Sequence, residues 1–266
     1  MSVLDDILVS KRNEVTMLHR PEVRDLLRSE ALAAPATRDF AGALRTGTGT
    51  IAVLAEIKRR SPSKGDLAPD LDPGATAAAY AAGGAAGLSV LTDGPYFGGS
   101  VHDLHAARAA CTLPVLRKDF VIDEDQVFET RALGADAMLL IVAAVPDDTV
   151  LSDLHALAVD LGLAVLVEVH DAAELDRALA VGARVVGVNA RDLGTFAEDL
   201  GTGERLVATI PTDVLAVAES AIRCRDDAAR MGEAGFDAVL VGEMLVKSPD
   251  PTSLVRDLAS VARRAR

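Results

Sequence analysis

Short apolar runs recur along most of the chain, separated by longer Ala-rich stretches in which charged residues are scattered. Apolar runs of about 4–8 residues are typical of buried strands, and the stretches between them are long enough for helices. Successive runs lie roughly 20 to 35 residues apart, which is about one strand and one helix each. The pattern predicts eight strands, at 51–57, 87–91, 114–118, 136–142, 164–169, 185–189, 214–218 and 238–242.

The junctions that lead from a helix to a strand repeat one sequence design, in which an Ala-rich stretch ends at a glycine, a short turn follows and an apolar run begins. Gly134, Gly182 and Gly235 stand where a left-handed residue is needed to close a helix. Such junctions are typical of βα units in a parallel sheet. Copies of the design lie at 132–140, 180–188, 233–241 and 83–90.

Eight parallel strands are the number that closes a barrel, so the predicted fold is an α/β (β/α)8 TIM barrel, with the single domain spanning 1–266. A doubly wound open sheet is the alternative. Its dinucleotide-binding form carries G-x-G-x-x-G after the first strand, and residues 59–65 lack that motif. The barrel therefore explains the pattern better.

Residues 1–50 do not follow this regular spacing of strands and helices, and they form a predicted helical extension of the barrel domain. Apolar residues with helical spacing indicate an amphipathic helix. They are Leu4, Ile7, Leu8, Val15 and Leu18. A second helical piece at 24–28 is followed by a loop at 34–37. The extension either plugs the bottom of the barrel or covers its catalytic mouth, and the sequence leaves both alternatives open.

Composition and charge narrow the class of ligand. Half of the 266 residues are hydrophobic, which supports a sizeable core, while aromatic residues make up only 3%. The formal net charge of -13 argues against a nucleic-acid partner, because such surfaces carry clustered positive charge. An anionic ligand must therefore be held by a local group of basic residues.

The first residues have no basic start, so we expect no signal peptide, and no run approaches the ~18 apolar residues of a membrane span. Cys111 and Cys224 lie far apart without C-x-x-C spacing, so we expect neither a disulfide framework nor a cysteine metal site, and a cytoplasmic location. No metal site is expected from the histidines, because they show no metal-ligand spacing. They are His19, His102, His105, His155 and His170.

Polar residues collect at the predicted carboxyl ends of the strands, where βα barrels carry their chemistry. The first strand ends in Glu56 and Lys58, which lie two apart and so point to the same side. Acids and bases converging on one rim form an acid/base set whose pKa values proximity and burial can move toward neutrality. Lys118, Glu168 and Glu219 are the other acids and bases of this set, and Asn189, Arg191 and Ser220 are further polar residues at the strand ends.

Two other interpretations of these charged residues at the strand ends stay open. Ion pairing among these side chains would also explain them, and Glu219 is the least secure member because it could serve only to orient a neighbour.

Phosphate is expected at the ends of the seventh and eighth strands, where small residues around Ser220 and Gly242 let backbone N–H groups approach an anion. Phe97, Phe120 and Leu193 could clasp an aromatic group or could belong to the core.

Taken together, these motifs resemble the indole-3-glycerol phosphate synthase family, over nearly the whole chain. The resemblance rests most on Glu56–Ser63 and includes an N-terminal segment, Val3–Leu8, that is similar to the extra helix of the family. The supporting motifs are Ser89–Thr92, Phe97–Ser100, Leu116–Phe120, Leu166–Val169, Val188–Arg191, Glu219–Ser220 and Val241–Gly242.

The resemblance implies a (β/α)8 barrel that converts 1-(2-carboxyphenylamino)-1-deoxyribulose 5-phosphate to indole-3-glycerol phosphate, with release of carbon dioxide and water. It implies a lyase of tryptophan biosynthesis that needs no cofactor or metal. The expected partner is therefore a small phosphorylated substrate, with no nucleic acid and no membrane. Exposed Ala-rich helices are compatible with a monomer or a weak homodimer.

The resemblance also implies roles for the rim residues. Lys118 would protonate the ketone oxygen during ring closure, and Glu168, assisted by Lys58 or Glu56, would move protons in the dehydration. Asn189 would orient the developing hydroxyl group. Ser220 is grouped with these catalytic residues, and Glu219 with the substrate-binding ones. Which lysine acts as the acid in dehydration stays open.

Substrate binding is assigned in the same way. Arg191 would lie near the anthranilate carboxylate. The phosphate would meet Lys58, Ser61, Ser220, Gly242 and residue 243, and the aryl group would meet Phe97, Phe120, Leu139, Ile141 and Leu193. Residue 243 departs from the family, since it is Glu243 where many relatives have serine. A carboxylate repels phosphate, so we expect Glu243 to offer only its backbone N–H, with the side chain turned away.

Two other functions compete with this one. Phosphoribosylanthranilate isomerase shares the barrel and the phosphate position. Its family is expected to carry a cysteine and an aspartate as the acid/base pair, and no cysteine stands at the first strand end here. A non-catalytic barrel that binds sugar phosphates or partner enzymes belongs to a different class. It predicts ligand binding without turnover, and the dense acid/base set at the rim argues against it.

Overall fold

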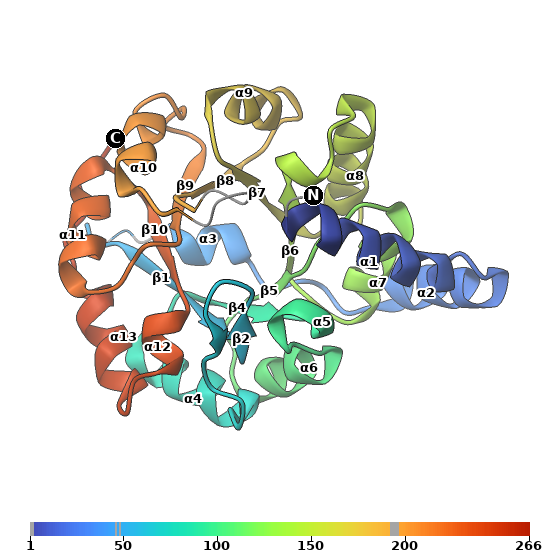
Figure 1. Cartoon of the computed structure of the whole chain (residues 1–266), viewed down its shortest axis with the longest axis horizontal. Helices are drawn as coiled ribbons and strands as arrows, with labels where there is room; N and C mark the ends of the chain where they lie inside the picture. Colours follow the sequence, from blue (N-terminus) through green and yellow to red (C-terminus); the bar gives the residue numbers. More distant parts are fainter. Residues whose placement is uncertain (1–2, 46, 48, 192–196) are drawn as a thin grey trace.

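The computed structural model describes residues 3–45, 47, 49–191 and 197–266. Its centre is a closed barrel of parallel strands in the order β1-β10-β9-β8-β7-β6-β5-β4 (Figure 1). The predicted barrel is confirmed, and each strand end lies within one residue of the predicted one. The strands are β1 Ala52–Ile57, β4 Gly87–Leu91, β5 Val115–Lys118, β6 Ala137–Ile141, β7 Ala164–Val169, β8 Val185–Asn189, β9 Leu215–Glu219 and β10 Ala238–Val241.

Helices surround the barrel, as Figure 1 shows. Most begin at an aspartate or serine whose side chain accepts backbone N–H bonds of the first turn, as Asp72 and Ser100 do. Gly134, Gly182 and Gly235 have φ of 77°, 84° and 105°, which confirms the predicted left-handed helix closures. The ring consists of α4 Pro73–Gly83, α6 Val101–Ala110, α7 Glu124–Ala132, α8 Asp148–Asp160, α9 Ala172–Ala180, α10 Leu200–Val207, α11 Arg225–Ala234 and α13 Pro251–Ala259.

Two apolar layers hold the barrel together. One lies between strands and helices, and the other fills the barrel interior, where Leu54, Leu116 and Leu166 are fully buried. Both layers consist largely of aliphatic residues, which explains how a chain poor in aromatic residues builds a large core. No helix of the described residues is long and apolar enough to cross a membrane.

The N-terminal extension both covers the mouth of the barrel and plugs its bottom, the two alternatives that the sequence left open. It forms α1 Val3–Leu18, α2 Pro21–Ala33 and α3 Phe40–Leu44. Ile7 and Leu8 of α1 join the interior layer at the mouth, where α1 residues line the main cavity. The segment before α3 runs along the opposite end, because Arg38 donates to backbone carbonyls in the loop that precedes β5. Thus α1 covers the mouth and α3 plugs the bottom.

Short elements follow several strands at the mouth, and the apolar pattern did not predict them. A two-stranded antiparallel ribbon, β2 Arg60–Ser61 with β3 Gly65–Asp66, follows β1. The others are α5 Gly94–Phe97 after β4, the 3-10 turn η1 Val142–Ala144 after β6, and α12 Glu243–Val246 after β10. These elements bring loop residues over the barrel mouth, where the cavity lies.

Candidate active site

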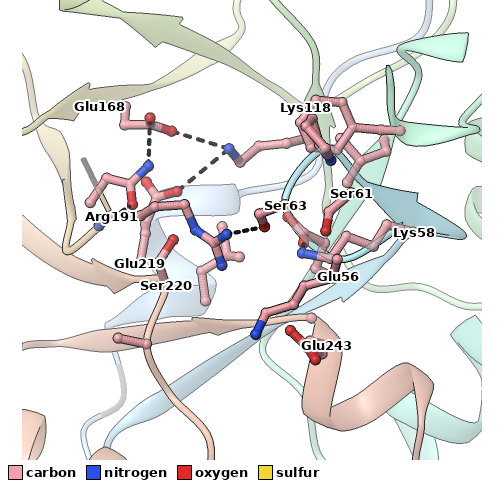
Figure 2. A pocket seen from close by; sticks show the side chains of 18 of the residues that line it. Glu56, Lys58, Ser61, Ser63, Lys118, Glu168, Arg191, Glu219, Ser220 and Glu243 are labelled. Atoms are coloured by element: carbon pink, nitrogen blue, oxygen red, sulfur yellow. Dashed lines mark hydrogen bonds and ion pairs between the residues drawn. The ribbon is translucent and has the colours of Figure 1, made fainter. Parts of the chain in front are cut away.

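A cavity of about 380 Å³ opens at the carboxyl ends of the strands. All fifteen predicted site residues that the structure describes line it, and Figure 2 shows the charged ones gathered around one space. Leu193, the sixteenth, lies outside the described residues. The lining residues predicted from sequence are Glu56, Lys58, Ser61, Phe97, Lys118, Phe120, Leu139, Ile141, Glu168, Asn189, Arg191, Glu219, Ser220, Gly242 and Glu243.

Lys118 at the end of β5 points toward two carboxylates, one at the end of β7 and one at the end of β9 (Figure 2). Its Nζ is 3.1 Å from Oε2 of Glu168 and 3.6 Å from Oε2 of Glu219. Both glutamates are almost fully buried, with 1% and 2% of their surface exposed. The ammonium group is therefore the nearest positive charge to two carboxylates that water scarcely reaches.

Glu168 is oriented by a second residue. Asn189 at the end of β8 donates from Nδ2 to Oε1 of Glu168 at 2.9 Å, and its Oδ1 accepts the backbone N–H of Arg191 at 3.0 Å. The amide is thus fixed at both ends. One carboxylate oxygen of Glu168 is held by Asn189, and the other faces Lys118.

Burial and charge move the pKa values of this group in different directions. Burial alone would lower the pKa of Lys118, but Glu168 and Glu219 outweigh it and raise the pKa. Burial would raise the pKa of Glu168, but Lys118, His170 and Asn189 together outweigh it and lower the pKa. Burial and the neighbouring Glu168 raise the pKa of Glu219 to about 8. The expected move toward neutrality is thus wrong for Lys118 and Glu168, because each has an opposite charge in contact, and right for Glu219.

Glu56 and Lys58 form a second acid/base pair on β1 and just beyond it. The two groups are 2.6 Å apart, and Glu56 also accepts from Oγ of Ser89 at 3.4 Å. Gly242 makes room for this pair, since a Cβ there would lie 2.4 Å from Oε1 of Glu56 and 3.0 Å from Nζ of Lys58. The glycine predicted for an approach to phosphate therefore has a packing role as well.

The end of β9 has an unusual backbone. Ser220 and Ala221 follow Glu219 with φ of 65° and 58°, a left-handed conformation that costs a non-glycine residue free energy. Such strain is common at functional sites. Together with Gly242, these residues form the wall of the cavity at the ends of β9 and β10.

The Glu243 side chain lies beside its own helix. Its Oε1 is 2.7 Å from Nζ of Lys247, one turn further on, and this contact lowers the pKa of Glu243. Because Lys247 lines the same cavity, the expectation that the carboxylate turns away from a phosphate stays a prediction. The contact brings Lys247, which the sequence analysis did not single out, to the cavity wall.

Arg191 lies in a chain of polar contacts across the mouth. Its guanidinium contacts the hydroxyl of Ser63 in the loop after β1 (Figure 2). It also contacts the carboxylate of Glu198. Glu198 also contacts Arg223, in the loop after β9. Ser63 stands in the Glu56–Ser63 motif but was given no role in the site. Motif reasoning missed Glu198 and Arg223, because they approach the site only through the conformations of loops.

The remaining wall of the cavity is apolar. The rings of Phe97 and Phe120 lie 6.1 Å apart, centroid to centroid, and both residues line the cavity together with Leu139 and Ile141. The α1 residues Val3, Leu4 and Ile7 complete this wall. Sequence reasoning left the position of α1 open and so did not include its residues in the site, although Leu4 and Ile7 belong to its predicted apolar face.

Among the described residues, one group of side chains could hold a metal ion, and it lies outside this cavity. It consists of His19 after α1 with Asp123 and Asp125 at the start of α7. Asp125 already pairs with Nε of Arg24 at 3.1 Å, so the group functions as an ion-pair cluster between α2 and α7. Its members are far apart in sequence, which is why residue spacing gave no sign of it.

Comparisons with known proteins agree with this geometry. A sequence model of the family described as "Indole-3-glycerol phosphate synthase" matches residues 4–258. The chain belongs to this family. Indole-3-glycerol phosphate synthase of Laribacter hongkongensis is 49% identical over 259 residues, covering 96% of this chain and 98% of that protein. The enzyme of the same name from a Nocardioides species is 50% identical over 261 residues, covering 98% and 99%.

A solved structure supports the fold alone. Thiamine phosphate pyrophosphorylase from Pyrococcus furiosus superposes with a TM-score of 0.59 at 16% sequence identity, over 80% of this chain and 96% of that one. The resemblance to the indole-3-glycerol phosphate synthase family, predicted from motifs at the strand ends, is confirmed by the family match. The comparisons do not favour phosphoribosylanthranilate isomerase.

Proposed function

We propose that this protein is a carboxy-lyase that converts 1-(2-carboxyphenylamino)-1-deoxyribulose 5-phosphate to indole-3-glycerol phosphate, carbon dioxide and water. The observation that carries the proposal is the contact of Lys118 with the two buried carboxylates of Glu168 and Glu219, at the mouth of a barrel of this family. A cation held in this way can deliver a proton to a ketone, and a neighbouring carboxylate can take one from carbon.

The cavity offers three kinds of wall that match three parts of this substrate. Lys58, Ser61 and the backbone at Ser220 and Gly242 would bind the phosphate, and all four residues line the cavity. The apolar wall around Phe97 and Phe120, with Leu139 and Ile141, would hold the aryl ring, and Arg191 would pair with the carboxylate. Leu193 was assigned to the aryl wall from sequence and stays a prediction.

Ring closure comes first. The aryl carbon that bears the carboxylate attacks the ketone carbon, and Lys118 gives a proton to the ketone oxygen as the new bond forms. The carboxylate then leaves as carbon dioxide, and the electron pair of the broken bond returns to the ring. The buried position of Lys118 suits this step, because a proton donor is most effective where water does not compete.

Dehydration follows. The hydroxyl leaves as water after it receives a second proton, and a base removes a proton from the carbon next to nitrogen. Glu168, whose pKa is lowered in the resting site, suits the base, and Asn189 would orient the hydroxyl. Glu219 carries a proton at neutral pH because its pKa is raised to about 8, so it joins Lys58 as a candidate acid. Over the whole reaction the site takes up one proton.

The experiment that tests the proposal is the indole fluorescence assay with purified protein and the named substrate, since the chain contains no tryptophan. We expect a rise with the wild type and at least about a 100-fold slower rise with Lys118→Ala. Arg230→Ala, which removes an exposed ion pair with Glu204, is the control and should keep wild-type turnover. Substrate binding without any rise would favour the sugar-phosphate-binding scaffold, and near-normal turnover by Lys118→Ala would refute the assigned role.

We also propose a cytoplasmic enzyme that is a monomer or a weak homodimer. Two cysteines without a disulfide, Cys111 half-buried and Cys224 exposed, suit a reducing compartment. Multi-angle light scattering over a range of protein concentrations tests the oligomeric state, and a stable higher oligomer at low concentration would contradict it.

A further inference from the structure

His170 lies directly beside the proposed base. It follows β7, and its Nε2 is 3.5 Å from Oε1 of Glu168, the oxygen that also accepts from Asn189. Lys118 faces the other oxygen of the same carboxylate. Glu168 therefore has a basic residue at each oxygen, His170 at Oε1 and Lys118 at Oε2. His170 has no part in the steps described above.

Glu174 holds the imidazole ring in place. One of its oxygens, Oε2, lies 2.9 Å from Nδ1 of His170 and accepts the backbone N–H of the same residue at 2.8 Å. A carboxylate only accepts hydrogen bonds, so Nδ1 must carry a proton. Nε2 is buried without a hydrogen-bond partner among the described residues and faces a carboxylate. A lone pair pointed at that oxygen would be repelled, whereas an N–H would be attracted, so the ring is an imidazolium.

The charged surroundings of the ring support this state. Burial lowers the pKa of His170, but Glu168 and Glu174 outweigh it and raise the pKa to about 10. The nearest charged side chain on the next turn of α9, Arg177, turns instead to Asp148 and to the carbonyl oxygen of Val145. Among the described residues, the groups that act on the charge of His170 are thus the two carboxylates on either side of it.

We propose that His170 is a positioning residue for the proposed reaction, whose imidazolium, held by Glu174, keeps Glu168 ionised and oriented once Lys118 has given its proton to the ketone. When Lys118 becomes a neutral amine, Glu168 loses its nearest positive charge. Its neighbour Glu219 has a raised pKa and so holds a proton. Without a second cation, Glu168 would then share the proton of Glu219 and could no longer act as a base. The inference rests on the proposed function.

The first test is the pH dependence of kcat. In His170→Gln the amide can still donate to Glu168 but carries no charge, so the acid limb of the kcat profile should move up by at least about one pH unit, while KM changes less than about threefold. Glu174→Gln should shift the limb in the same direction by less. His105→Gln, on the exposed face of α6, is the matched control and should reproduce the wild-type profile.

Two results would overturn the proposal. One is an unchanged acid limb in His170→Gln. The other is a loss of kcat that is equal at every pH and accompanied by a lower Tm, because that result indicates a purely structural role.

A second measurement does not depend on turnover. Nitrogen-15 NMR of the His170 ring should show both nitrogens protonated up to pH 8, and a neutral ring at pH 7 would refute the inference whatever the activity. A cationic ring in a protein that forms no indole product would instead count against the proposed function, and the positioning role would fall with it.

Discussion

At the scale of single residues, the site separates two carboxylates that start out chemically alike. Glu168 contacts Lys118 and Asn189 and stays ionised, whereas Oε1 of Glu219 is buried without a hydrogen-bond partner among the described residues. Gly187 makes this arrangement possible, because a Cβ there would lie 1.9 Å from Oε1 of Glu219. Two carboxyl groups with pKa values driven apart can serve as base and acid in one site.

Glu219 should therefore make the stability of the protein depend on pH. Its folded-state pKa of about 8 lies above the ordinary value of 4.5, so its contribution to stability is fully present below the ordinary value and is lost as the pH rises through about 8. Glu219→Gln imitates the protonated form and should escape this loss. We expect the Tm of the variant, relative to the wild type, to increase by at least about 2 °C between pH 6 and pH 9.

Thermal melts of both proteins across that pH range provide the measurement. Glu233→Gln, at an exposed position on α11, is the control and should run parallel to the wild type. If Glu219→Gln also runs parallel, the raised pKa of Glu219 is wrong. The same variant should lose at least about tenfold in kcat, because an amide cannot give up a proton as an acid.

The sequence could predict the acid and base residues but not their pairing. Glu56, Lys118, Glu168 and Glu219 end apolar runs, and the barrel places all strand ends on one rim, so local pattern and topology suffice to bring them together. The distances between the side chains of that rim depend on side-chain conformation and on glycines such as Gly187. In the sequence, such a glycine looks like any other residue of a strand. For that reason Glu219, the least secure member by sequence, proves to have the most unusual environment among the acids of the rim.

At the scale of elements, the lid helix α1 is fixed by one buried lysine. Nζ of Lys11 lies 2.9 Å from Oδ2 of Asp93 and 2.9 Å from Oδ1 of Asp119, and only 1% of the residue is exposed. Asp93 also accepts the backbone N–H groups of Tyr96 and Phe97 at the start of α5, and Asp119 follows Lys118 directly. The anchor of α1 is thus joined to the aryl wall and to the proposed acid.

Replacing Lys11 by methionine should release α1. Removing one partner of a buried ion pair typically costs about 3–5 kcal/mol. Here undocking of α1 lets water reach Asp93 and Asp119, so we expect the lid to detach while the barrel stays folded. KM should rise at least about tenfold, because Val3, Leu4 and Ile7 leave the cavity wall, and kcat should change less.

Hydrogen exchange measured over residues 3–18 tests this expectation, with Arg12→Met, an exposed neighbour on the same helix, as the control. Faster exchange confined to α1 in Lys11→Met would support the anchor. Wild-type protection of α1 together with a raised KM would show that Lys11 acts in some other way.

The regular elements could be predicted from the sequence, and the irregular ones could not. Strands and surrounding helices follow from apolar runs and capping glycines, which act over a few residues. The ribbon β2–β3 and the short helices α5 and α12 span only two to four residues each, too few for a periodic apolar pattern. Whether the extension covered the top or the bottom depended on long-range contacts such as those of Arg38 and Lys11.

At the scale of the whole molecule, the distribution of lysine resolves the conflict between an acidic protein and an anionic substrate. The net charge is -13, and the chain has five lysines. Four of them, Lys58, Lys64, Lys118 and Lys247, line the cavity, and the fifth anchors the lid. Lysine is an adaptable proton donor with a compact charge, whereas most basic residues elsewhere are arginines, many of them in ion pairs. Positive charge is thereby focused where the substrate would bind.

Substitutions at the mouth of the barrel should mainly affect catalysis, and substitutions at the bottom should mainly affect stability. A matched pair of phenylalanines tests this division. Phe40 in the bottom plug and Phe120 at the mouth both belong to the interior layer, with 1% and 8% exposed. Phe40→Ala leaves an enclosed cavity in the plug, which typically costs about 3–5 kcal/mol, so Tm should fall by roughly 10 °C while kcat and KM stay within about twofold at 25 °C.

Phe120→Ala should show the opposite balance. Its side chain borders the open cavity and Phe97, so truncation enlarges a space that is already present and costs less stability than truncation of Phe40. Loss of the aryl wall should raise KM at least about tenfold. Thermal melts and steady-state kinetics on both variants decide the matter. A raised KM in Phe40→Ala, with the protein still folded at the assay temperature, would mean that the plug at the bottom transmits its packing to the mouth, and the division between the two ends would fail.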